Sequence, residues 1–202
     1  MAKRSAPEVN AGSMADIAFL LLIFFLVTTT IETDSGISRK LPPIEDVEDP
    51  PIIKQKNIFT VVVNRNDQLL VEDDLMELKD LRAAAVAFLD NGGGQGEEAC
   101  DYCKGKRDAS SSDNPDKAII SLQNDRFTSY NAYISVQNEL VAAYNELRNR
   151  EAERLFGMKF TEMEALAKDG SNYSGNRDRL KENIERVKLM YPQKLSEAEP
   201  KK

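Results

Sequence analysis

The sequence contains no histidine and no tryptophan among its 202 residues. The absence of histidine excludes His-based catalytic triads, histidine general bases and nearly all catalytic zinc sites. No phosphate-binding P-loop occurs either, because the glycine cluster at residues 92–96 lacks the lysine that would hold phosphates. We interpret that cluster as a flexible connection. These absences argue against an enzyme, and no catalytic residue, cofactor or metal site is predicted.

Positive charge is also in short supply. The chain has 27 lysine and arginine residues against 34 aspartate and glutamate residues, which gives a net charge of −7. Such a surface repels phosphates, and no basic stripe in the sequence offsets the repulsion. Nucleic acid is therefore not expected as a partner.

Cysteine is limited to Cys100 and Cys103, spaced as Cys-Asp-Tyr-Cys. A single CxxC pair cannot complete a tetrahedral zinc site without further ligands, and a thioredoxin-like role requires a βαβ context that is not predicted here. If this segment lies outside the cytoplasm, a short-range disulfide that pins a loop is the favoured interpretation.

Long apolar runs are absent except for one at residues 14–31. Its 18 residues would form a helix of about 27 Å, close to the thickness of a bilayer core. No Ala-x-Ala cleavage site follows the run, so we expect an uncleaved transmembrane anchor rather than a signal peptide. Two basic residues lie close to each end, and orientation rests on the short tail at residues 1–13, which we expect to be cytoplasmic.

Asp16 is the one charged residue in this run. A carboxylate at mid-bilayer costs roughly 2.5–3.5 kcal/mol, so such a group indicates ion or proton movement, or pairing with another subunit. The alternative is that Ser13 caps the helix and Asp16 only complements its dipole. A stripe at helical spacing favours a protein- or pore-facing role; it consists of Asp16, Leu20, Ile23, Val27 and Thr30. Thr28 and Thr29 weaken that stripe because they place hydroxyls on other faces.

Residues 32–57 contain four prolines and few large apolar side chains. Proline pairs favour extended backbone, so this segment is predicted to be a tether that could reach on the order of 75 Å. The remaining residues, 58–202, are polar enough to form a soluble domain.

The soluble domain is predicted to contain strands, helices and one irregular insertion. In chain order these are a strand at 58–64, a returning strand at 68–72, a helix at 78–89, an insertion at 91–116, a strand at 117–123, a helix capped by Thr128 and running to about residue 156, helical segments at 160–190, and a break at Tyr191 and Pro192 before a charged tail. One face of the long helix is predicted to hold Tyr130, Ile134, Leu140, Val141, Tyr144 and Leu147. The order predicts a small α+β domain, one sheet with helices on one face.

The apolar run and its leading aspartate, in residues 13–29, resemble the anchor of the ExbD/TolR biopolymer transport family. The order of tail, span, tether and α+β domain resembles that family too. The resemblance implies an inner-membrane protein of a Gram-negative cell, with a periplasmic domain at residues 58–202. It also implies a homodimer inside a pentameric, multi-span ExbB-like partner that uses proton flow to energise TonB or TolA. The family's membrane aspartate matches Asp16, which would take up and release protons.

On this resemblance we expect an ExbD-type subunit that energises TonB-dependent outer-membrane transport. A TonB-like partner is expected to add a strand at an exposed edge, and the strand suggested for this role consists of Ile58, Phe59, Thr60, Val61, Val62 and Val63. Two alternatives stay open: a TolR-like subunit that contacts peptidoglycan, and a passive anchored scaffold in which Asp16 only caps a helix.

Overall fold

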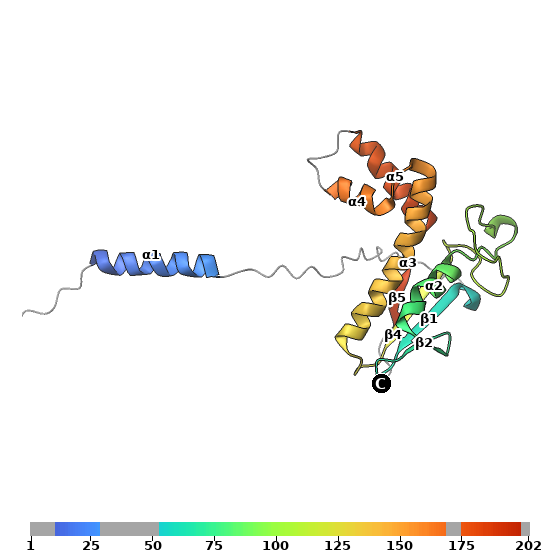
Figure 1. Ribbon diagram of the computed structural model, residues 1–202, viewed down its shortest axis with the longest axis horizontal. Coiled ribbons are helices and arrows are strands. Elements are labelled where there is room, and N and C mark those ends of the chain that lie inside the picture. Colours follow the sequence, from blue (N-terminus) through green and yellow to red (C-terminus); the bar gives the residue numbers. More distant parts are fainter. Residues whose placement is uncertain (1–10, 29–52, 169–174, 199–202) are drawn as a thin grey trace, which may run out of the picture. The chain divides into compact units, whose positions relative to one another are not determined.

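The computed structural model describes residues 11–28, 53–168 and 175–198. The chain divides into two compact units, Met1–Asp49 and Pro50–Lys202, and each is considered by itself. The first unit contributes one described element, helix α1 (Ala11–Thr28) (Figure 1). Most of the predicted tail and tether, together with residues 29–31 of the predicted span, lies outside the described residues.

The second unit is built on one five-stranded sheet with the order β3-β2-β1-β4-β5. Its strands are β1 (Ile58–Val63), β2 (Leu69–Val71), β3 (Asp74–Met76), β4 (Ile119–Asn124) and β5 (Leu195–Ala198). Pairing is antiparallel from β1 through β2 to β3, and parallel between β1 and β4 and between β4 and β5. The sheet is therefore mixed, with a hairpin edge on one side and parallel crossovers on the other.

Strand β1 lies in the middle of this sheet. Its side chains alternate: Phe59, Val61 and Val63 are buried, whereas the residues between them are half-buried. Because β2 and β4 pair with its two sides, β1 offers no free edge. The prediction that residues 58–63 form an exposed edge for a partner is therefore wrong. A strand rich in β-branched residues suits the centre of a sheet, where the neighbouring strands occupy the hydrogen-bonding groups on both of its edges.

Two helices cover one face of the sheet, α2 (Leu78–Leu89) and α3 (Tyr130–Phe156) (Figure 1). They share one core with the buried side of the strands, which includes Leu81, Phe88, Leu140, Tyr144 and Leu147. The predicted α+β class, with a sheet and helices, is thus confirmed.

The start of α3 differs from the prediction. Ser129, rather than Thr128, caps the helix, and its side chain accepts a hydrogen bond from the N–H of Ala132. The Thr128 hydroxyl instead donates to the carbonyls of Val63 and Asn64, which anchors the helix start to the end of β1. Tyr130, predicted on the buried face, is the first residue of α3 and is 78% exposed.

The C-terminal segments form a second small core. Helices α4 (Phe160–Lys168) and α5 (Arg177–Met190) pack on the end of α3 through a cluster that includes Phe160, Met163 and Ile184. The chain does break after α5, but the predicted tail then forms β5, which pairs with β4 and closes that side of the sheet.

Two short 3-10 helices complete the second unit, η1 (Gln55–Asn57) and η2 (Gly96–Glu98). The predicted extended tether thus ends before residue 55. Asn57 is buried, and its side-chain amide is paired there: it donates to the Asp113 carboxylate and accepts from the Asp113 N–H.

Candidate functional site

Helix α1 carries apolar side chains around its whole circumference. Nine large ones are 40–62% exposed: Met14, Ile17, Phe19, Leu20, Leu21, Leu22, Ile23, Phe24 and Phe25. A helix that is apolar on all sides is normally covered by lipid or by other helices. Helix α1 is the one element among the described residues of its unit, and these nine side chains are exposed there.

Asp16 is the exposed carboxylate on this helix. Because α1 begins at Ala11, Ser13 lies inside the helix and Asp16 is in its second turn. The alternative in which Ser13 is the N-cap is therefore wrong for this helix, since the cap precedes the first turn. Of the predicted stripe, Leu20 and Ile23 follow Asp16 at helical spacing, whereas Thr30 lies outside the described residues.

Within the described ranges, which end at Thr28 for this part of the chain, no helix is both long enough and apolar enough to cross a membrane. The predicted span at residues 14–31 runs past that point. The anchor therefore stays a prediction.

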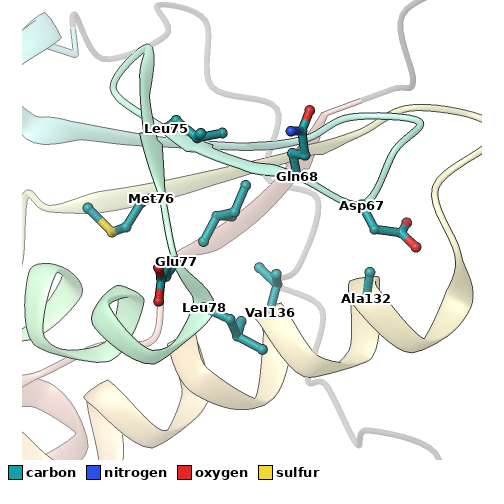
Figure 2. Close-up of a pocket in the computed structure, with 9 residues that line it drawn as sticks. Asp67, Gln68, Leu75, Met76, Glu77, Leu78, Ala132 and Val136 are labelled. Carbon is teal, nitrogen blue, oxygen red and sulfur yellow. The ribbon is translucent and has the colours of Figure 1, made fainter.

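A second candidate site is a pocket of about 460 Å³ beside strand β3 (Figure 2). It opens between the β2–β3 hairpin and the first turns of α2 and α3. Its lining residues are Asp67, Gln68, Leu69, Leu75, Met76, Glu77, Leu78, Ala132 and Val136. The floor is mainly apolar, and the polar groups lie at the rim, as in many ligand sites.

Local chemistry fixes the walls of this pocket. The β2–β3 turn is made by Glu72 and Asp73, which have φ values of 51° and 73°, as a two-residue hairpin of the primed type requires. On the opposite wall, the Ser129 N–H donates to Asp67 at 2.9 Å. This bond holds the start of α3 next to the turn after β1.

The hairpin and the start of α2 are strongly acidic. Residues 67–80 contain six acidic residues and one lysine, a net charge of −5 in a chain whose total is −7. Glu77 pairs with that lysine, Lys79, at 2.6 Å, and both side chains are 72% exposed. An exposed ion pair of this kind stabilises the fold little, and either side chain can readily pair with another charge instead.

Sequence reasoning missed this pocket. Strand β3 has three residues flanked by acidic side chains, so it lacks the run of β-branched residues that would predict a strand. The pocket also needs three segments that lie far apart in the sequence. The signal that could have found it is the excess of acidic residues around Leu75 and Met76.

The insertion at residues 91–116 is cross-linked internally by a disulfide and is joined to the start of the second unit through Asp113. Cys100 and Cys103 form a disulfide, and a Cβ on Gly92, which has a φ of +66°, would lie 2.8 Å from the Cβ of Cys103. The buried Asp113 carboxylate meets Lys56 at 2.5 Å and accepts from Asn57. Burial alone would raise the pKa of Asp113, but these donors outweigh it and lower the pKa. The contacts tie the start of the unit to the insertion.

In the part of the chain that the structure describes, no group of three or more cysteine or carboxylate residues is arranged to hold a metal ion.

Comparison with known proteins gives two matches. A family model described as "Biopolymer transport protein ExbD/TolR" matches residues 2–150, so the match ends inside α3, and α4, α5 and β5 lie beyond it. The chain is also 32% identical over 65 residues to "Biopolymer transport protein exbD2" of Vibrio cholerae serotype O1. That alignment covers 32% of this chain and 46% of the relative, so the chain spans about half the length of the relative it matches.

Proposed function

The chain belongs to the ExbD/TolR family of biopolymer transport proteins, and from that premise we propose that it is the proton-driven subunit of an ExbB–ExbD-type motor in the inner membrane. In this role residues 14–31 are the anchor and Asp16 carries the proton. The observation that carries the proposal is Asp16 itself, the one charged residue between Glu8 and Glu32.

The exposure of α1 supports a membrane setting for this carboxylate. A helix with apolar side chains on every face loses less by meeting lipid or partner helices than by meeting water. An aspartate on such a helix is costly in lipid, so it is expected to face protein or water. Leu20 and Ile23 share the face of Asp16 and would then contact the partner helices.

Proton transfer through this carboxylate follows from simple electrostatics. A carboxyl group in water holds no proton at neutral pH, whereas burial between helices favours the protonated form. One elementary charge that crosses a potential of 100 mV releases about 2.3 kcal/mol. If a partner helix stabilises the ionised form of Asp16 in one orientation only, that energy biases the rotation of α1 between two ways of packing against the partner helices.

The disulfide supports a periplasmic second unit. Disulfides persist in oxidising compartments such as the bacterial periplasm and are rare in the cytosol. The Cys100–Cys103 bridge therefore suits residues 58–202 being outside, with the short tail at residues 1–13 in the cytoplasm. The proline-rich segment at residues 32–57 would then span the distance from the membrane to the partner.

The proposed assembly has two copies of this chain inside a pentameric ExbB-like protein, with a TonB-like protein as the energised partner. The name of the Vibrio cholerae relative favours an ExbD-type role over a TolR-type role. Pull-down with peptidoglycan, compared with co-purification of a TonB-like protein, distinguishes the two roles.

Proton-gradient-dependent uptake tests the proposal. Cells that lack the native gene are complemented with wild type, Asp16→Asn or Asp16→Glu at equal membrane levels, and uptake is measured with and without an uncoupler. Asp16→Asn is expected to abolish uptake because an amide does not titrate, whereas Asp16→Glu keeps a carboxyl group and is expected to retain a part of it.

Co-purification of a multi-span partner with Asp16→Asn is the control for assembly, and Asp101→Asn, an exposed carboxylate of the insertion, is the matched neutralisation. Normal uptake in Asp16→Asn would refute the proton-carrying role and leave a passive scaffold.

A further inference from the structure

We propose that the free side of β3 and the adjoining pocket bind an extended, cationic segment of a partner protein, which joins the sheet as an added strand. The inference rests on the proposed function in one respect: an energised partner outside the membrane supplies the segment. The binding surface itself is argued from three features of the second unit.

The first feature is the backbone of β3. It is an outer strand of the described sheet, and it pairs with β2 through Leu70 opposite Leu75 and Val71 opposite Asp74. In a two-residue hairpin the pair next to the turn exchanges both hydrogen bonds, and the next pair exchanges none. Leu75 therefore directs its N–H and C=O away from β2, where an added strand could bond to both.

The second feature is the apolar space on the helix side of this edge. An added strand would direct alternate side chains toward the pocket, where Leu69, Met76 and Val136 form the lining (Figure 2). Leu78 is 40% exposed beside it, and Leu75, which pairs with Leu70 and so lies on the opposite face of the strand from Met76, is 70% exposed. Apolar side chains of the segment would thus bury apolar surface that now meets water.

The third feature is charge. The exposed side chains of Glu72, Asp73, Asp74, Glu77 and Asp80 surround the edge, and Lys79 is the one basic residue between residues 67 and 80. An acidic segment would be repelled here, whereas lysine or arginine alternating with apolar residues would meet opposite charge. Charge complementarity therefore selects a cationic occupant.

The opposite edge of the sheet lacks this space. At β5 the Glu197 carboxylate accepts hydrogen bonds from Tyr133 at 2.8 Å and from Gln137 at 2.7 Å. These hydrogen bonds bridge the outer strand and α3. The corresponding gap at β3 is the pocket, so β3 is the edge that combines free backbone with room for side chains.

A peptide titration tests the proposal. The full chain, purified in detergent, is mixed with a fluorescein-labelled peptide of alternating lysine and valine, and binding is followed by anisotropy. A matched peptide with glutamate in place of lysine is the charge control. We expect the cationic peptide to bind and the acidic one to fail, with weaker binding as salt screens the attraction.

Two sets of variants locate the site. Neutralising Asp74 and Glu77 together (Asp74→Asn with Glu77→Gln) is expected to weaken binding about fivefold, whereas the same change at Glu153 and Glu182, on α3 and α5, should not. Leu75→Pro removes the outward N–H and should bind about fivefold more weakly than Leu75→Ala, which keeps it.

Equal binding of both peptides, or equal binding by Leu75→Pro and Leu75→Ala, would overturn the proposal. So would a change in sedimentation of Leu75→Pro without peptide, because that result assigns the edge to a second copy of the chain. Since the assay needs no proton gradient, binding combined with normal uptake by Asp16→Asn would sink the proposed function and leave this inference standing.

Discussion

Asp90 joins three segments that are far apart in the sequence. Its carboxylate receives two hydrogen bonds from the Arg150 guanidinium, at 2.6 and 2.8 Å, and one from the Tyr191 hydroxyl at 2.7 Å. The Gly105 N–H donates to the Asp90 carbonyl. This buried residue at the end of α2 thus contacts the C-terminal part of α3, the residue after α5 and the insertion.

The pKa of Asp90 gives a prediction at this scale. Burial alone would raise it above the ordinary 3.8, but the donors from Arg150 and Tyr191 outweigh burial and lower it. The folded state therefore favours the ionised form, and this stabilisation is present above pH 4 and is lost as the pH falls below that value. Asp90→Asn should cost about 2 kcal/mol at pH 7, and the difference from wild type should shrink below pH 4.

Urea unfolding of both proteins between pH 2.5 and pH 7 measures this difference. Asp116→Asn is the control, since Asp116 is 69% exposed and its bond to Lys194 should contribute little. A difference that stays constant across the range would show that the charge of Asp90 is not what stabilises the contact.

At the scale of elements, the local sequence pattern correctly predicted the existence of β1, the returning strand, α2, β4 and most of α3. Each has a run of β-branched residues or a clear helical period. Local pattern did not predict β3 and β5, because these strands have only three and four residues among charged neighbours, too few to show the alternation of apolar and polar residues that is typical of a strand. It also misplaced β1 at an edge, since β1 pairs with β4, and local pattern does not show which strands that lie far apart in the sequence become neighbours.

The candidate sites divide in the same way. Asp16 could be found from the sequence because a lone charge in an apolar run is a local signal. The pocket beside β3 could not, because Leu69, Met76 and Val136 meet only through the fold. Cys100 and Cys103 lie three residues apart in the sequence, so a short disulfide between them was the favoured interpretation for a segment outside the cytoplasm.

Arg148 gives the prediction at the element scale. Its buried guanidinium donates twice to the Tyr191 carbonyl, at 2.9 and 2.7 Å, and lies 5.7 Å from the Tyr144 ring centre and 5.2 Å from that of Phe160. It therefore joins the main core to the core of α4 and α5. Arg148→Met should keep the packing of the stem but leave the carbonyl unpaired, at a cost of about 2 kcal/mol.

Hydrogen exchange checks where that cost falls. We expect faster exchange of amides in α4 and α5, with protection in β1 and β4 retained. Arg186→Met, an exposed change on α5, should leave all of them unchanged. Equal loss of protection in the sheet would contradict the division into two cores.

At the scale of the whole molecule, the chain separates its chemistry by unit. One unit holds an apolar helix with a single carboxylate, and the other holds the acidic sheet unit with its disulfide and pocket. The family match covers the first unit and most of the second, but not α4, α5 and β5. The helix proposed to carry the proton thus lies within the part of the chain that matches the family.

Proton flux through the reconstituted assembly tests the central claim most directly. The chain and its multi-span partner are placed in liposomes that enclose a pH-sensitive dye, and a potassium gradient with valinomycin sets the potential. Wild type should acidify the interior, and Asp16→Asn should reduce the rate at least about tenfold, to that of the partner alone, because the one titratable group in the span is gone. Unchanged flux in Asp16→Asn, with Asp101→Asn equal to wild type, would contradict the account.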